Sequence, residues 1–289
     1  MARRDLLVIA ERFLDVLVRG GIESLPLAES ARTTYNGREL PLGQGDVWRA
    51  AARIPARQTF VDPESGGVAF FGVISSSTSA HASLVKRTWF YGVRLAVRDG
   101  LIREVEEISF EGTWAHYSAD PGSVEVDPRF EAVLPVEERS SREELERIVE
   151  VYCAAVARTG PGSAVAFHPD ARRTELGQPT TDDWNFPHSA RGDFSNEGWR
   201  WQISNLRSPV MDIARGVIVS IFALRLDEQS NPLFSPTLVM EAFKIEDGLI
   251  RRMFAVYHAG TGDDGWPGGE SDSRAMVARG SSADASALR

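Results

Sequence analysis

The sequence Asp99-Gly100-Leu101-Ile102-Arg103 occurs a second time, unchanged, as Asp247-Gly248-Leu249-Ile250-Arg251, 148 residues later (247 − 99). In both places apolar residues precede and follow the Asp-Gly pair. Asp-Gly is a strong signal for a two-residue β-hairpin turn, because that turn needs positive φ at both positions. A five-residue identity at a long, fixed separation indicates an internal repeat.

Two further matches lie in the same order along the chain. Ala31–Gly37 resembles Ala171–Gly177 at an offset of 140 residues (171 − 31). Asp62-x-x-x-Gly66, followed by an apolar run, resembles Asp212-x-x-x-Gly216 at an offset of 150 residues (212 − 62). Because the three offsets differ only by loop-sized amounts, the chain is predicted to hold two copies of one module in tandem.

A helix is predicted at the start of each copy, because apolar residues recur there at steps of three and four. These residues are Leu6, Ile9, Ala10, Phe13, Leu14 and Leu17 in the first copy, and Leu145, Ile148, Val149, Tyr152 and Val156 in the second. Ser140 or Ser141, followed by acidic residues, is typical of a helix N-cap.

Strands are predicted to follow each helix. Val93-Arg94-Leu95-Ala96-Val97 alternates as expected of a strand with one buried and one exposed face. The predicted fold class is therefore α+β, with each module a curved antiparallel sheet packed on N-terminal helices. We expect a first module at 1–118, an ordered linker at 119–140, a second module at 141–260 and a flexible tail at 261–289, which is rich in Gly, Ser, Ala and Asp.

The net charge and the cysteine count indicate which binding partners and which cellular compartment suit this chain. The formal net charge of −9 argues against a nucleic-acid binder and against adhesion to an anionic membrane. Cys153 is the single cysteine, which fits a reducing, cytoplasmic location. The apolar N-terminus is interrupted by charged residues, so it is not interpreted as a signal peptide.

The stretch Leu25–Gly43, together with the Asp-Gly-x-Ile-Arg hairpins, resembles the SnoaL-like branch of the nuclear-transport-factor-2-like (NTF2-like) superfamily. In that branch the segment usually carries Glu-Asn-Gly. Here Tyr35 stands at the Glu position of the first copy, whereas the second copy keeps the acid as Glu175 and replaces the Asn by Leu176. The resemblance covers nearly all of residues 1–260.

This resemblance implies a cone-shaped fold with a deep, largely apolar pocket. Members include polyketide cyclases, ketosteroid isomerases, epoxide hydrolases, dehydratases and lyases, while others only bind ligands or partners, so the fold alone does not specify an activity. Members usually pair as dimers. A tandem chain is therefore expected to form an internal pseudo-dimer, and it can also form a homodimer.

Acid/base chemistry in such a pocket needs carboxylates or histidines whose pKa is tuned by burial. The candidate catalytic residues are Glu175, His258, His168, His188 and Tyr35. The candidate substrate-binding residues are Arg173, Trp184, Trp199 and Tyr257. Each also has a structural interpretation: a solvated histidine at a strand end, an arginine in an ion pair, or an aromatic ring in the core.

No metal-ligand spacing, Gly-x-Gly-x-x-Gly, P-loop or Gly-x-Ser-x-Gly motif occurs in the sequence, so we expect neither a metal nor a cofactor. The leading hypothesis is a cofactor-independent lyase, isomerase, cyclase or dehydratase that acts on an oxygenated aromatic or polyketide-like small molecule, with the second module active. Two alternatives stay open, an epoxide hydrolase and a non-catalytic protein that binds small molecules or serves as a scaffold.

Overall fold

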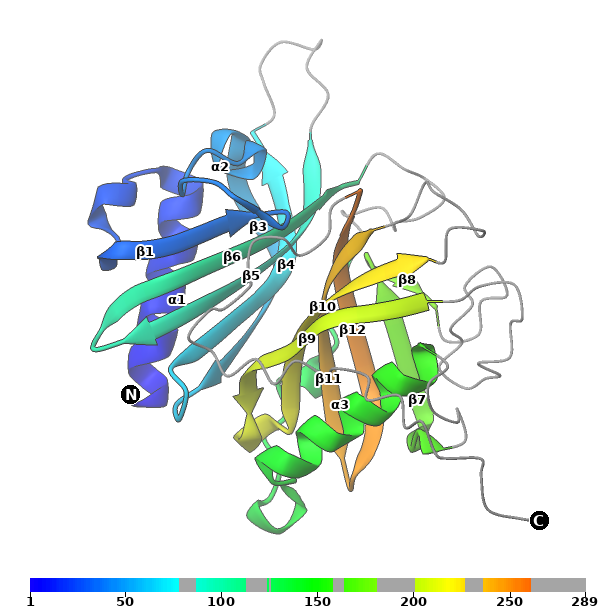
Figure 1. Ribbon diagram of the computed structural model, residues 1–289. Helices are drawn as coiled ribbons and strands as arrows, with labels where there is room; N and C mark the ends of the chain where they lie inside the picture. The colour runs from blue at the N-terminus through cyan, green and yellow to red at the C-terminus, as the bar shows by residue number, and fades with distance from the viewer. Residues whose placement is uncertain are drawn as a thin grey trace, which may run out of the picture.

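The computed structural model describes residues 1–77, 87–112, 124, 126–157, 164–180, 201–226 and 236–260. Their elements form two similar sets, each a long helix followed by six strands (Figure 1). The first set consists of α1 (Arg3–Arg19), β1 (Leu27–Tyr35), β2 (Arg38–Glu39), α2 (Asp46–Ala50), β3 (Ala51–Asp62), β4 (Gly67–Ser76), β5 (Thr88–Arg98) and β6 (Leu101–Glu111). The second consists of α3 (Arg142–Val156), β7 (Phe167–Glu175), β8 (Gln178–Pro179), β9 (Trp201–Asp212), β10 (Val217–Leu226), β11 (Thr237–Glu246) and β12 (Leu249–Ala259).

Local sequence signals account for the helix and hairpin positions. All the apolar residues predicted to share one face of α1 and of α3 are buried. Ser141 is the N-cap of α3, and its hydroxyl accepts a hydrogen bond from the backbone N–H of Glu144 at 3.2 Å. Asp99 and Gly100 have φ values of 54° and 77°, and their repeat has 53° and 71°, as the predicted turn requires.

The two sheets have the same strand order, β2-β1-β6-β5-β4-β3 and β8-β7-β12-β11-β10-β9. The α+β class and the two tandem modules are thus confirmed. Each sheet is mixed and not purely antiparallel, because β1 runs parallel to β6 and β7 runs parallel to β12. The strand order shows why: the chain enters each sheet next to its last strand, a long-range pairing that no local pattern reveals.

The registers also repeat, which fits a tandem duplication. Tyr35 pairs with Glu107 at the end of β1, and Glu175 pairs with Ala255 at the end of β7. Tyr35 and Glu175 therefore occupy equivalent positions in the two modules, as their sequence alignment predicts.

The two sheets pack against each other, and the long helices lie on the outer faces (Figure 1). One apolar cluster between the sheets joins Phe71 and Ile108 of the first module to Val219 and Met240 of the second. Each sheet is consequently covered on both faces. This corrects the expectation of a half-exposed strand at Val93–Val97, because Arg94 is only 4% exposed.

Reciprocal ion pairs connect the modules at the seam. Arg3 donates to both carboxylate oxygens of Asp212 at 2.7 and 2.8 Å, and Arg142 donates to both oxygens of Asp62 at 3.1 and 2.8 Å. Each arginine begins the long helix of its own module and contacts the equivalent aspartate of the other. Burial alone would raise the pKa of Asp62, but hydrogen bonds from Arg142 and Ser65 bring it below its usual value.

The described part of the linker lies against the second module. It contains short 3-10 helices at Pro128–Phe130 and Val136–Glu138, and Phe130 and Leu134 are buried. The predicted flexible tail, 261–289, lies outside the described residues. Among the described residues, no helix is both long and apolar enough to cross a membrane.

Candidate functional site

Two consecutive glutamates on β6 point to opposite faces of the first sheet. Glu106 faces the second module and forms an ion pair with Arg207, whereas Glu107 faces the interior of its own module, between the sheet and the helices. Both are at most 2% exposed. Since successive side chains of a strand alternate between faces, the pair necessarily places one carboxylate on each side.

Glu107 is a buried carboxyl group with a raised pKa. Its Oε1 accepts a hydrogen bond from Trp48 Nε1 at 2.6 Å and another from the hydroxyl of Tyr91. Burial raises the pKa of Glu107 to about 7, with a smaller contribution from the charge of Asp46, while the hydrogen bonds from Tyr91 and Trp48 oppose the shift. A carboxyl group with such a pKa can both donate and accept a proton near neutral pH.

A second polar group lies closer to the surface of the same module. The hydroxyl of Tyr35 donates to Asp46 Oδ1 and lies 2.7 Å from Ser109 Oγ. Trp89 Nε1 donates to Asp46 Oδ2 at 3.3 Å. Burial, with the contact to Asp46, raises the pKa of Tyr35 well above its ordinary value, so this phenol stays protonated.

The two groups lie at different depths. The Asp46 side chain is 42% exposed, and Arg87, which is equally exposed, donates to it at 3.1 Å. Glu107 lies at the buried end of the cluster, so polar side chains extend from solvent to a carboxyl group with a shifted pKa. Buried acids with perturbed pKa values next to hydrogen-bond donors are typical of sites of proton transfer.

The second module has different polar residues at its equivalent positions. Glu175 replaces Tyr35, and Ala255 replaces Glu107. Arg173 donates from Nε to Glu241 at 3.0 Å and also forms an ion pair with Glu175. Burial raises the pKa of Glu241, and the charge of Arg173 only partly offsets the effect.

The structure brings Glu175 and Arg173 together, but it does not bring His168 or His258 to them. His168 lies at the other end of β7 and contacts Asp170. Six residues of extended strand lie between His168 and Glu175, which places their Cα atoms roughly 20 Å apart.

His258 lies on the face of β12 that meets the first module. Its Nδ1 is 2.9 Å from the carbonyl oxygen of Ser109. Tyr257 packs its ring against Phe110 of the first module, with 5.7 Å between the ring centroids. His258 and Glu175 therefore lie on opposite faces of the second sheet, so the candidates Glu175, His168 and His258 do not form one cluster. His188, Trp184 and Trp199 lie outside the described residues.

Sequence reasoning selected Tyr35 but missed Glu107, Asp46 and Tyr91. The available signal was the adjacent pair Glu106-Glu107 in a predicted strand, because two adjacent acids in a strand cannot both face solvent if either face is buried. Asp46 carried no signal of its own, since it opens the short helix α2 like many structural aspartates.

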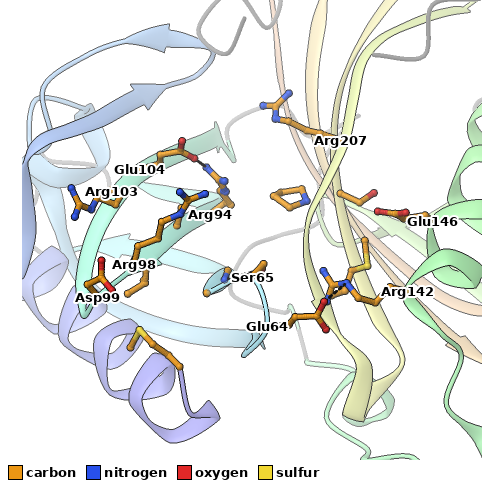
Figure 2. Close-up of a pocket in the computed structure, with 18 residues that line it drawn as sticks. Glu64, Ser65, Arg94, Arg98, Asp99, Arg103, Glu104, Arg142, Glu146 and Arg207 are labelled. Carbon is orange, nitrogen blue, oxygen red and sulfur yellow. Dashed lines mark hydrogen bonds and ion pairs between the residues drawn. The ribbon is translucent and has the colours of Figure 1, made fainter. Parts of the chain in front are cut away.

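The seam between the modules contains a cleft of about 740 Å³ (Figure 2). Its walls carry charged side chains, including Arg94, Arg98 and Glu104 from the first module and Arg142 and Arg207 from the second. The cleft is polar, in contrast to the largely apolar pocket that the superfamily resemblance implies. In the described part of the chain, no three His, Cys, Asp or Glu side chains gather as a metal ion requires.

One family model matches the second module. Residues 138–257 match the model described as Domain of unknown function (DUF8021). No curated protein matches the chain.

Several solved structures resemble one module each. A de novo designed protein with a curved β-sheet is 17% identical, with a TM-score of 0.29, and the match covers 38% of this chain and 88% of that one. AclR from Streptomyces galilaeus is 11% identical, with a TM-score of 0.29 and coverage of 37% and 80%. An NTF2-like protein from Burkholderia xenovorans LB400 is 13% identical, with a TM-score of 0.27 and coverage of 38% and 92%.

Proposed function

We propose that this protein is a cofactor-independent acid/base enzyme that acts on an oxygenated small molecule, with its principal site in the first module. The observation that carries the proposal is Glu107, a buried carboxyl group whose pKa is raised to about 7 and whose Oε1 accepts hydrogen bonds from Tyr91 and Trp48. Such a group matches the requirement for a general acid or base at neutral pH.

The roles follow from depth and hydrogen bonding. Glu107 transfers the proton. Tyr35 stays protonated, and a substrate oxygen takes the place of Asp46 Oδ1 as the acceptor of its single hydroxyl hydrogen. This combination suits an isomerase, lyase, cyclase or dehydratase of the SnoaL-like kind, because each needs proton transfer next to a polarised oxygen.

The second module is assigned a supporting role. Its equivalent of Glu107 is Ala255, and Glu175 is already ion-paired with Arg173. We further propose that the pairing of the two modules replaces the homodimer that such folds usually form, and that the protein works in the cytoplasm, for which its single cysteine argues.

The test is a turnover screen of the full chain against oxygenated aromatic and polyketide-like compounds, read by mass spectrometry. Glu107→Gln should lower kcat/KM on any converted compound by roughly 10²- to 10⁴-fold. Glu175→Gln, the same carboxyl-to-amide change in the second module, should stay within about tenfold of wild type. The reverse ranking would assign catalysis to the second module, and binding without turnover would favour a non-catalytic small-molecule binder.

A further inference from the structure

The turn between β1 and β2 contains a residue that binds β6 through both its backbone and its side chain. The backbone N–H of Asn36 donates to the carbonyl oxygen of Glu107 at 2.8 Å, and Asn36 Oδ1 accepts a hydrogen bond from the backbone N–H of Ser109 at 2.7 Å. Because an amide has its acceptor and its donors on different atoms, the second contact fixes the orientation of the Asn36 side chain. Its Nδ2 atom therefore faces the Ser109 hydroxyl, to which it donates at 3.2 Å.

The hydroxyl groups beyond Asn36 form a chain with one direction. A phenol has a single hydrogen, and Tyr35 gives it to Asp46 Oδ1, which as a carboxylate oxygen only accepts. The Ser109 hydroxyl, 2.7 Å from the Tyr35 oxygen, must therefore be the donor in that contact. The other acceptor near the Ser109 hydroxyl, Asn36 Oδ1, lies farther away at 3.4 Å and already receives a backbone N–H. Each hydrogen thus points away from Asn36 and toward the Tyr35 end of the chain.

This direction decides what the Tyr35 hydroxyl offers to a ligand. Burial and the contact with Asp46 raise the pKa of Tyr35, whereas hydrogen bonds from Ser109 and from the backbone of Val47 lower it. These two donors occupy the lone pairs of the phenol oxygen and favour negative charge on it. Tyr35 therefore acts only as a donor, and the substrate atom that replaces Asp46 Oδ1 must be an acceptor, as a carbonyl oxygen is.

The second module forms the same turn without the amide and without the serine hydroxyl. There the backbone N–H of Leu176 donates to the carbonyl oxygen of Ala255 at 3.0 Å, and the φ value of Leu176 is 46°, against 51° for Asn36. Tyr257 stands in place of Ser109, at the offset of 148 residues (257 − 109). The backbone contact between the turn and the last strand thus does not need the side chain of Asn36, so the fold alone does not account for it.

Burial makes the contact between Ser109 and Tyr35 effective. Ser109 is 4% exposed, so water does not compete for its hydroxyl. Hydrogen-bonded groups in a chain polarise one another, so a hydroxyl that receives hydrogen bonds is a stronger donor than one that receives none.

We propose that Asn36 and Ser109 are positioning residues that direct the Tyr35 hydrogen to a carbonyl oxygen of the substrate. Asn36 orients the Ser109 hydroxyl, and Ser109 strengthens Tyr35 as a donor when negative charge develops on that oxygen during proton transfer. This inference rests on the proposed function of Glu107 and Tyr35, and it specifies carbonyl compounds as the substrate class.

The experiment uses the full chain labelled with carbon-13 at the ζ carbon of tyrosine, whose NMR signal moves toward the phenolate position as the hydroxyl oxygen gains negative charge. The chain has five tyrosines, and Tyr35→Phe identifies the Tyr35 signal. Asn36→Asp keeps the size of the side chain and the acceptor for the Ser109 backbone N–H. It replaces the donating amide by an acceptor, however, and so turns the Ser109 hydroxyl hydrogen away from Tyr35.

Two further variants complete the set. Ser109→Ala removes the hydroxyl hydrogen outright and keeps the backbone contact with Asn36. Gln202→Glu is the control, because it makes the same amide-to-carboxyl change at an exposed position of β9 in the second module.

In Asn36→Asp and Ser109→Ala the Tyr35 signal should move away from the phenolate position, whereas in Gln202→Glu it should stay at the wild-type position. On any carbonyl compound that the protein converts, kcat should fall about fivefold or more in both site variants while KM stays within about twofold, because the lost hydrogen bond strengthens in the transition state. Circular dichroism and a thermal melt establish that each variant is folded, and Asn36→Asp provides the test if Ser109→Ala does not fold.

The NMR measurement needs no substrate, so it separates this inference from the function of Glu107. An unmoved Tyr35 signal in folded Asn36→Asp overturns the inference even if Glu107→Gln abolishes turnover. A moved signal with wild-type kcat, or a raised KM with unchanged kcat, overturns it as well. Full turnover in Glu107→Gln overturns the proposed function, while the Tyr35 signal still decides the direction of the hydrogen-bond chain.

Discussion

His258 of the second module places its Nδ1 atom 2.9 Å from the carbonyl oxygen of Ser109 in the first. The backbone N–H of Ser109 donates to Asn36 at 2.7 Å, and the Ser109 hydroxyl lies 2.7 Å from the Tyr35 hydroxyl. A side chain of one module thus supports the backbone beneath the candidate site of the other. On the proposed function, we expect His258 to act as a positioning residue.

His258→Ala should therefore have a modest effect. Loss of one partly buried hydrogen bond should lower the free energy of unfolding by about 1 kcal/mol. In any turnover assay kcat/KM should fall less than about tenfold, and the pH profile should keep its midpoint. Urea unfolding and the pH–rate profile check this, with His168→Ala as the control histidine that lies away from the seam. If the pH–rate profile of His258→Ala lacks the inflection seen in wild type, His258 is instead the general base.

Glu107→Gln should change how stability depends on pH. The folded-state pKa of Glu107, about 7, lies above the ordinary glutamate pKa of 4.5, so between these pH values the folded state keeps a proton that the unfolded state has lost. The contribution of the Glu107 proton to stability is fully present below about pH 4.5 and is lost as pH rises through 7. The free energy of unfolding therefore decreases by about 3 kcal/mol over this range. The difference between wild type and Glu107→Gln should change by that amount between pH 4 and pH 8 in urea titrations. If the unfolding free energies of wild type and Glu107→Gln change in parallel with pH, the pKa of Glu107 is not raised in the folded state.

Two neighbours of Glu107 should shift its pKa in opposite directions. Tyr91 stabilises the charged carboxylate through its hydrogen bond, so Tyr91→Phe should raise the pKa by about one unit. The charge of Asp46 raises the pKa, so Asp46→Asn should lower it. Carbon-13 NMR titration of labelled glutamate carboxyls, assigned with Glu107→Gln, measures both shifts. Equal shifts in the same direction would contradict the electrostatic account.

The reciprocal ion pairs should make equal contributions to stability. The Asp212 and Asp62 side chains are 0% and 1% exposed, so removing Arg3 or Arg142 leaves a buried carboxylate without its partner. Each single variant, Arg3→Ala or Arg142→Ala, should destabilise the fold by about 3 kcal/mol. A double-mutant cycle on Arg3 and Asp212 should give a coupling above about 1 kcal/mol. A coupling near zero, measured by urea unfolding, would show that the pair does not join the modules energetically.

Part of the candidate site was visible in the sequence. The repeat placed Tyr35 and Glu175 at equivalent positions, and the registers confirm this. His258 lies away from Glu175 because Glu175 pairs with Ala255, and residues three apart on a strand, such as Ala255 and His258, face opposite sides. Glu107 was missed because nothing local distinguishes the inward member of the pair Glu106-Glu107.

The sequence by itself determined the duplication, the two long helices with their buried faces and the Asp-Gly hairpins, because helix periodicity and turn dihedrals depend on residues close together in the chain. Only the tertiary structure decided that β1 runs parallel to β6, that both sheet faces are covered, and that Glu106 meets Arg207 while Glu107 lies inside. These features depend on contacts between residues about a hundred positions apart or on strand register, where a shift by one residue exchanges the two faces. The reciprocal pairing of Arg3 with Asp212 and of Arg142 with Asp62 has the same origin, since each pair joins residues of different modules that are far apart in the chain.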